Sequence, residues 1–198
     1  MQKTLVLLVF LLLMKNNSFS QDTLLVKFDK QRINHQKTGM IVLMSWAGAN
    51  IMSGTILRNN SVGDTKYFHE MNALWNTVNL FLGASGYYNA SRETPKSEAF
   101  HILGQQLKLE KTLLFNVGID VAYTTAGLYL LEKGNNQSDI IKRQRFRGYG
   151  RSLILQGGFL FLFDGIFYAI EANASNNLRE AMSMIYISPS GIGLNYRF

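Results

Sequence analysis

The feature that most constrains this chain is the loss of charge from four long windows. Two windows contain no Asp, Glu, Lys or Arg over 20 and 21 residues, and two more contain a single aspartate each. The windows are 38–57, 71–91, 112–131 and 152–170. A helix needs about 20 mainly apolar residues to cross ~30 Å of hydrocarbon. The pattern therefore predicts four transmembrane helices, near 39–57, 68–90, 112–131 and 152–171.

The average composition hides this pattern. A hydrophobic content of 47% and a mean hydropathy of +0.01 are ordinary for a soluble protein, but the apolar residues are gathered into the windows. We expect an all-α fold, a four-helix transmembrane bundle forming one membrane-embedded domain over 21–198. Turn-rich 59–64 and 134–139 are expected as loops, and so is the longer stretch 91–111, which contains Pro95. A soluble all-α protein with long buried helices remains the plain alternative.

The amino terminus is typical of a secretory signal peptide. Lys3 supplies a positive charge, Leu5–Met14 is an unbroken apolar run, and Ser18 and Ser20 place small residues before a cut at Gln21. Ten apolar residues rise only about 15 Å as a helix, roughly half of a bilayer core. We therefore expect residues 1–20 to be a cleaved signal peptide rather than a membrane anchor.

The densest group of basic residues in the chain follows the 134–139 turn. It consists of Lys142, Arg143, Arg145, Arg147 and Arg151. Interleaved Phe146 and Tyr149 would also suit a nucleic-acid surface. Positive charge directly against a transmembrane window, however, is typical of the cytoplasmic side and of contact with anionic lipid. With a net charge of +7, we expect a lipid bilayer, not nucleic acid, as the partner, and the inner cell membrane as the location.

Polar residues inside the windows are arranged in faces. Taking ~100° per residue, His69, Asn72, Asn76 and Asn79 fall within one arc of their helix. Asn116 shares a face with Asp120, and Gln156 shares one with Asp164. The predicted polar core, a candidate binding site, comprises Asn50, His69, Asn72, Asn76, Asn79, Asn116, Asp120, Gln156 and Asp164.

The two intramembrane acids leave two interpretations open. A carboxylate at bilayer depth costs at least ~2.5 kcal/mol unless it is paired or protonated, so both should point inward, towards amides such as Asn50, Asn76 and Gln156. The polar core then either holds the helices together by hydrogen bonds or forms a cavity for a small solute or proton.

Signatures of catalysis are missing from the sequence. There is no glycine-rich phosphate loop and no nucleophile elbow, and the chain contains three histidines and no cysteine. His69 and Glu70 are adjacent, so on a helix their side chains diverge by ~100° instead of sharing a metal. We expect no metal, no cofactor and no enzyme activity.

A membrane β-barrel is the alternative architecture, and with it an outer-membrane location. Residues 115–123 alternate apolar with small or polar side chains, which is the pattern of a lipid-facing strand. The carboxyl-terminal segment Ile185–Phe198 also resembles a terminal barrel strand. The windows, however, run to about twice the 9–11 residues that a barrel strand needs.

Several short motifs together resemble an uncharacterised bacterial family. They are Trp46-x3-Asn50, Phe68-His69-Glu70-Met71-Asn72, Asn116-x-Gly-x-Asp120-x-x-Tyr123, Arg147-Gly148-Tyr149-Gly150, Gln156-Gly157-Gly158, Asp164 and the Gly-Leu-x3-Phe ending. Members are membrane proteins of about this length with a signal peptide and no known function. The resemblance implies a helical membrane protein and no activity. We therefore expect a structural or accessory component with a protein partner in the membrane, or alternatively a small-solute or proton carrier or channel.

Overall fold

The computed structural model describes the backbone of residues 2–183, 185–188 and 191–194, and the side chains of residues 23–180 and 182. Its elements are α1 (Gln2–Asn59), α2 (Gly63–Arg92), α3 (Ala99–Asn135), α4 (Ile140–Ser183), β1 (Ile185–Ser188) and β2 (Gly191–Leu194). The predicted all-α, four-helix bundle is confirmed. A short antiparallel hairpin, in which Ile185 pairs with Leu194, follows it.

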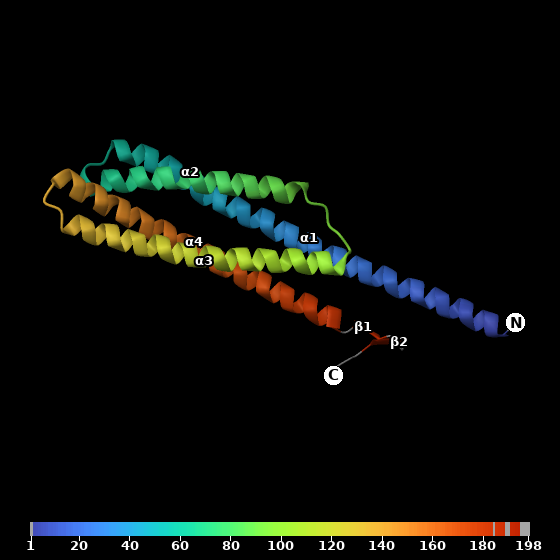
Figure 1. The fold of residues 1–198 in the computed structure, drawn as a ribbon. Helices are drawn as coiled ribbons and strands as arrows, with labels where there is room; N and C mark the ends of the chain where they lie inside the picture. The colour runs from blue at the N-terminus through green and yellow to red at the C-terminus, as the bar shows by residue number, and fades with distance from the viewer. Residues whose placement is uncertain (1, 184, 189–190, 195–198) are drawn as a thin grey trace.

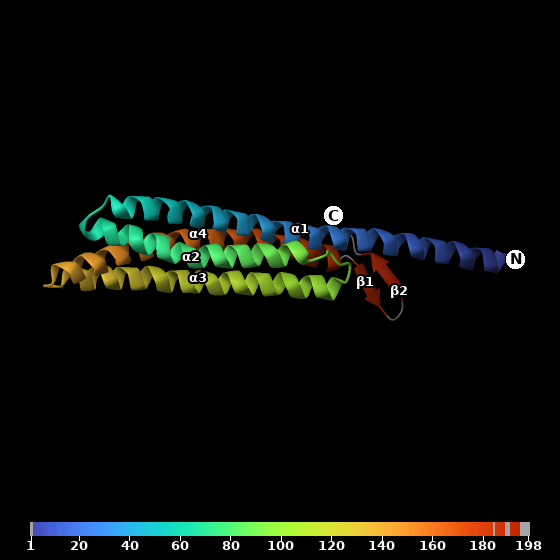
Figure 2. The same cartoon turned by 90° about the horizontal axis from the view of Figure 1, so that it is seen from above.

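The helices run up and down, each antiparallel to the next (Figures 1 and 2). Loops 60–62 and 136–139 meet at one end, here called the hairpin end, and loop 93–98 lies at the other, the terminal end. α1 packs along α2 and α3 packs along α4, and the two pairs meet mainly where α2 packs on α4. The α2–α3 loop is shorter than the 91–111 stretch expected, because α3 already begins at Ala99.

Glycines allow α4 to approach its neighbours closely. A Cβ added at Gly127 of α3 would lie 2.8 Å from the backbone oxygen of Gly150 of α4. One added at Gly148 of α4 would lie 2.7 Å from the backbone nitrogen of Phe68 of α2. Real Cβ atoms do not come that near to backbone, so any side chain at these positions would push the helices apart. Small residues at helix contacts are a feature of membrane bundles.

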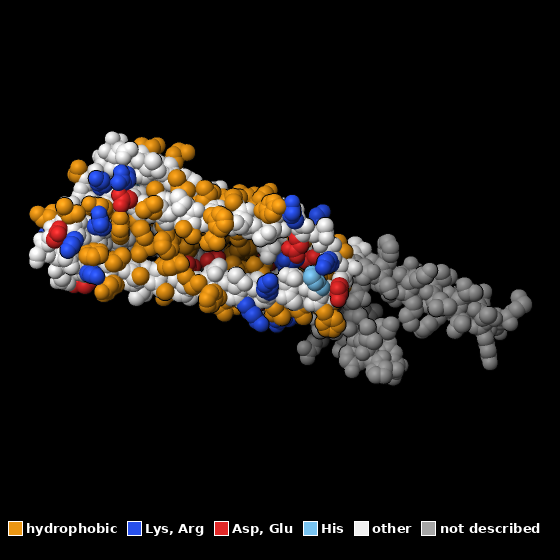
Figure 3. Space-filling view, turned by 45° about the horizontal axis from the view of Figure 1, so that its top comes forward, with side chains coloured by type: hydrophobic (Ala, Val, Ile, Leu, Met, Phe, Trp, Pro, Cys, Tyr) orange, Lys and Arg blue, Asp and Glu red, His pale blue; other side chains and the backbone are white. Residues whose placement is uncertain are grey.

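The outside of the bundle is apolar along its middle and charged at both ends (Figure 3). Three helical segments are long and apolar enough to cross a membrane: Thr23–Asn59, Ala99–Asn135 and Ile140–Glu180. Only 17–33% of their most apolar windows is buried inside the protein, whereas the long buried helices of a soluble protein would be covered. α2 is not among the three, since asparagines and glycines lower its hydropathy; its crossing stays a prediction.

The barrel alternative is wrong. The alternating segment 115–123 lies inside α3, where successive side chains point around a helix and not to two faces of a sheet. At the carboxyl end the described strands pair only with each other. Residues 189–190 and 195–198 of the expected terminal strand lie outside the described residues.

α1 continues past the ends of the other helices towards the amino terminus (Figures 1 and 2). The expected signal peptide, 1–20, falls in the part of α1 whose side chains are not described. Among the described side chains, the first buried one is Leu25, which packs with Ile102 and Leu178. Leu25 lies just after the expected cut at Gln21, and the cut itself stays a prediction.

Candidate functional site

A chain of amide hydrogen bonds joins three helices in the middle of the bundle. The indole nitrogen of Trp46 on α1 donates to Gln156 Oε1 on α4 at 2.8 Å. Gln156 Nε2 donates in turn to Asn72 Oδ1 on α2, and Asn72 Nδ2 donates to Asn50 Oδ1 on α1 at 2.7 Å. Asn50 Nδ2 closes the chain on the backbone oxygen of Trp46 at 2.8 Å. We call this set the amide chain.

Two further asparagines continue the amide chain along α2. Asn76 Nδ2 donates to the backbone oxygen of Asn72 at 2.8 Å, and Asn79 Nδ2 donates to Asn76 Oδ1 at 3.3 Å. Asn76 and Gln156 have no exposed surface, and Asn72 and Asn79 are buried. An unsatisfied buried amide would cost about 1–3 kcal/mol. The bonds of Asn76 and Asn79 satisfy their amides within α2, and the interhelical bonds of the amide chain hold α1, α2 and α4 in one register.

The two acids form a second cluster, between α3 and α4. The carboxyl groups of Asp120 and Asp164 lie close enough to interact with each other, and the Asn116 amide lies close to Asp164. Both acids are buried, and Asp120 Oδ2 has no partner among the described residues. A carboxylate only accepts hydrogen bonds, so two of them can bond each other only by holding a proton between them.

The region between α2 and α3 is bridged by side chains. α2 and α3 do not pack backbone to backbone, and the ring of Trp75 bridges them by meeting the ring of Tyr123 edge-on at 4.7 Å between centroids. Figure 3 shows the bundle hollowed near its middle, with acidic side chains visible below an apolar rim.

The nine predicted core residues thus divide unevenly. Five are in the amide chain and its extension: Asn50, Asn72, Asn76, Asn79 and Gln156. Asn116 lies beside the acid pair, Asp120 and Asp164. The amides expected to face the acids, such as Asn50, Asn76 and Gln156, bond other groups instead. His69 belongs to neither cluster: its ring meets Phe68, and its buried Nδ1 has no described partner.

Sequence reasoning missed a charged network at the terminal end. Arg32 of α1 bonds Asp29 at 2.8 Å and also bonds Glu93 from the loop after α2. Asp29 Oδ2 accepts the backbone N–H of Lys96 at 2.9 Å. Asp29 and Arg32 are both buried. Since these residues come from separate segments without a shared period, only the i,i+3 spacing of Asp29 and Arg32 could have indicated it.

A second ionic contact lies beside this network. Glu171 of α4, which is fully buried, accepts a 2.9 Å bond from Gln106 Nε2 of α3 and lies 2.8 Å from His35 Nδ1 of α1. Glu171 is the first charged residue after the fourth window, and at ~100° per residue it falls on the same face of α4 as Gln156 and Asp164, which was its signal in the sequence. The terminal end is therefore joined by charged groups, with the Leu25 cluster packed nearby.

Some residues of the basic cluster at the hairpin end pair with other residues of the protein. Arg147 Nε lies 2.8 Å from Asp64 Oδ2 of α2, and the Arg145 guanidinium lies over the ring of Tyr67. Next to them, Glu70 of α2 accepts the Tyr149 hydroxyl at 2.6 Å and pairs with Arg58. Lys142, Arg143 and Arg145 stay exposed, and within the described residues no group of three His, Cys, Asp or Glu could hold a metal.

These features define a class: a four-helix bundle with an apolar exterior, charged ends and a polar core. The chain belongs to DUF6992, a family of unknown function, whose model matches residues 42–165. The match includes the whole amide chain and the acid pair and stops before Glu171. No curated protein and no solved structure matches the chain.

Proposed function

We propose that this is an integral membrane protein of the bacterial inner membrane, and that it serves as a non-enzymatic structural or accessory component. The amide chain carries the proposal. Its members bond each other across α1, α2 and α4, so their hydrogen-bonding capacity is spent on holding helices together and not on a solute. Interhelical bonds of this kind are the usual polar contacts of membrane bundles.

The exposed surface supports a membrane location. Large apolar side chains are exposed along the middle of every helix, for example Met52, Phe81, Phe115 and Phe161. In water a surface of this extent would drive association. Exposed Lys142, Arg143 and Arg145 at the hairpin end suit the anionic lipid of the cytoplasmic face.

Extraction and topology test this location. The protein should stay with membranes through alkaline carbonate washing, and a reporter fused in 135–141 should be cytoplasmic. A reporter fused after Asn173 should be periplasmic, because a cleaved signal peptide leaves the mature amino terminus outside. Recovery as a soluble monomer without detergent would remove the membrane proposal, whereas reversed reporters would remove only the orientation.

The outer face of α3 supports a protein partner. Gly118, Ala122 and Ala126 follow each other at four-residue spacing; Ala122 and Ala126 are exposed, and a Cβ at Gly118 would meet nothing within 4 Å. Small residues at this spacing allow a second helix to approach. Because the chain has no cysteine, an Ala122→Cys variant can carry a photo-crosslinker. We expect an adduct in native membranes that Gly118→Leu abolishes and that Gly165→Leu, in open space on α4, leaves intact.

A proton carrier or channel is the second candidate, favoured by the unpartnered Oδ2 of Asp120. If the acids only hold the bundle, Asp120→Asn and Asp164→Asn should change its stability in detergent by no more than ~1–2 kcal/mol. If they exchange protons, the wild type should show a thermal midpoint that varies between pH 5 and 8, and both variants should lose that variation. Flat, superimposable profiles would count against the carrier.

A further inference from the structure

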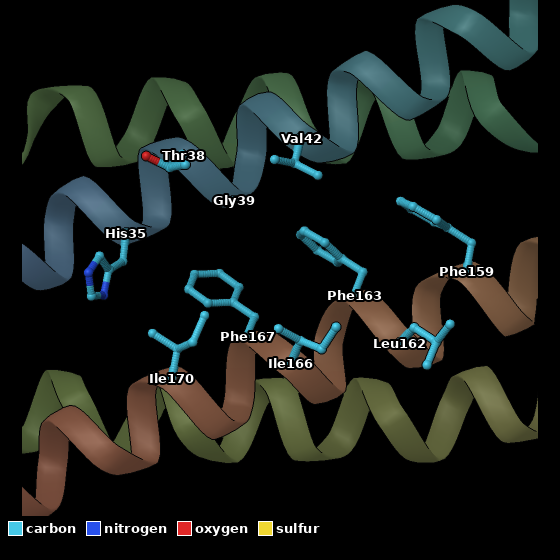
Figure 4. A pocket seen from close by; sticks show the side chains of 10 residues that line it. All are labelled: His35, Thr38, Gly39, Val42, Phe159, Leu162, Phe163, Ile166, Phe167 and Ile170. Carbon is cyan, nitrogen blue, oxygen red and sulfur yellow. The ribbon is translucent and has the colours of Figure 1, made fainter.

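A groove of about 550 Å³ runs between α1 and α4 on the outside of the bundle (Figure 4). Its floor is a row of three rings from α4, Phe159, Phe163 and Phe167, whose neighbouring centroids are 6.1 Å apart. Gly39 of α1 keeps the groove open, since a Cβ there would lie 2.7 Å from the Phe167 ring. The remaining apolar lining consists of Val42, Leu162, Ile166 and Ile170.

One end of the groove is polar. His35 and Thr38 of α1 lie there, and Figure 4 shows both on the α1 side of the end at which Ile170 extends from α4. The imidazole is held in place because its Nδ1 lies 2.8 Å from Glu171, while the ring remains partly exposed. The imidazole and the threonine hydroxyl can therefore both offer hydrogen bonds to a polar group at this end.

The groove has the depth of one bilayer leaflet. Phe159 and Ile170 are eleven residues apart on α4, which at ~1.5 Å per residue is about 16 Å, or half of a ~30 Å hydrocarbon core. Its polar end coincides with the boundary of the charge-free windows, at residues 38 and 170. Phe159, at the other end, lies near the level of the amide chain, because Trp46 stacks on it at 3.8 Å.

We propose that this groove binds one acyl chain of a bilayer phospholipid, with the headgroup at His35 and Thr38. The inference rests on the proposed membrane location. A transmembrane helix 10–12 Å across and ~30 Å long occupies roughly 2,000–3,000 Å³, several times the groove. A single chain is thin, enters sideways from the leaflet, and matches both the apolar lining and the polar end.

The two tryptophans of the chain provide the test. Trp46 lies at the inner end of the groove, whereas Trp75 lies on α2 against Tyr123. In a Trp75→Phe background, phosphatidylglycerol vesicles brominated along the acyl chain should quench Trp46 strongly. Filling the groove with Val42→Phe should reduce that quenching at least twofold. The matched control is Ile41→Phe, an equally exposed neighbour outside the groove, which should leave the quenching unchanged.

A second pair of variants repeats the comparison at two glycines of α1. Gly39→Leu blocks the groove from its α1 side, and Gly48→Leu adds the same volume on α1 where a Cβ meets nothing within 4 Å. Equal quenching in Val42→Phe and Ile41→Phe, or in both glycine variants, would overturn the proposal. So would quenching by a brominated free fatty acid alone, or a cross-link between two copies through Val42→Cys. Each of these results leaves the membrane location standing, which only the carbonate extraction tests.

Discussion

The middle and the terminal end of this bundle are held together by different chemistry. In the middle, neutral amides of Asn50, Asn72 and Gln156 bond one another across three helices. At the terminal end, charged groups do the same work, with Arg32 between Asp29 and Glu93 and with Glu171 beside His35. Both sets are largely buried, so burial alone does not explain which kind of group each region uses.

The surroundings explain the difference. The amide chain lies within the charge-free windows, where the proposed solvent is hydrocarbon, and there a neutral amide costs far less to bury than an ion does. The charged network lies beyond the windows, and some of its members remain in contact with solvent: the side chains of Glu93 and His35 are about 30% exposed. The ions there keep part of their hydration and also gain partners.

The acid pair is the exception inside the windows. Asp120 and Asp164 contact each other, so they can share a proton and enter the apolar region with less charge than two free carboxylates. The middle of the bundle therefore differs from the terminal end in the net charge that it buries, and not in whether it contains acidic residues.

Removing Arg32 should have the largest effect. Arg32→Met leaves Asp29 buried without its cation, and breaking a buried pair in this way costs about 3–5 kcal/mol. Thermal unfolding in mild detergent measures the loss. The control is Arg145→Met, because the Arg145 guanidinium is exposed and lies over Tyr67, so its loss should cost less than ~1 kcal/mol. Similar losses in the two variants would show that burial does not distinguish the terminal network.

This network also marks the limit of what the sequence could predict. The windows and the 3.6-residue period of Asn72, Asn76 and Asn79 predicted a helical bundle and which face of α2 turns inward. The hydrogen-bonding partners of these side chains could not be predicted in the same way, because they depend on how far each helix is shifted and rotated against its neighbour. Gly157, for instance, seats α4 against the backbone of Asp120, and no local pattern reports the resulting contact of Asp120 with Asp164. Asp29 and Arg32 share α1, but Glu93 is separated from them by the α1–α2 loop and α2, so periodicity could not join it to them.

Breaking the amide chain should have an intermediate effect. Gln156→Leu keeps the volume similar but leaves Trp46 Nε1 and Asn72 Oδ1 without their partner, at a cost of about 1–3 kcal/mol. The control is Thr125→Val, since the exposed Thr125 hydroxyl bonds only the backbone of its own helix. If Gln156→Leu were as costly as Arg32→Met, the middle of the bundle would depend on its polar bonds as strongly as the terminal end does.

The smallest effect on stability is expected from a substitution of Asp139, which lies in water outside both regions. Asp139 is an exposed residue before α4, and its carboxylate accepts the backbone N–H groups of Lys142 and Ile141. These bonds, that of Lys142 first, lower the pKa of Asp139 in the folded protein. A lowered pKa means that the stabilisation is present above the unfolded pKa of ~3.9 and is lost as the pH falls through the folded value.

Asp139→Asn keeps an oxygen that can accept both bonds but cannot titrate, so this part of the acid dependence should disappear while the fold is kept. Thermal midpoints of the two proteins between pH 3 and 7 would measure it. The variant should lie slightly below the wild type at pH 7, where the charge favours the helix amino terminus, and the two curves should converge at pH 3. A difference between the two thermal midpoints that widens towards pH 3 would contradict the lowered pKa of Asp139. Asp139 could then no longer serve as the solvent-exposed comparison for the two buried networks.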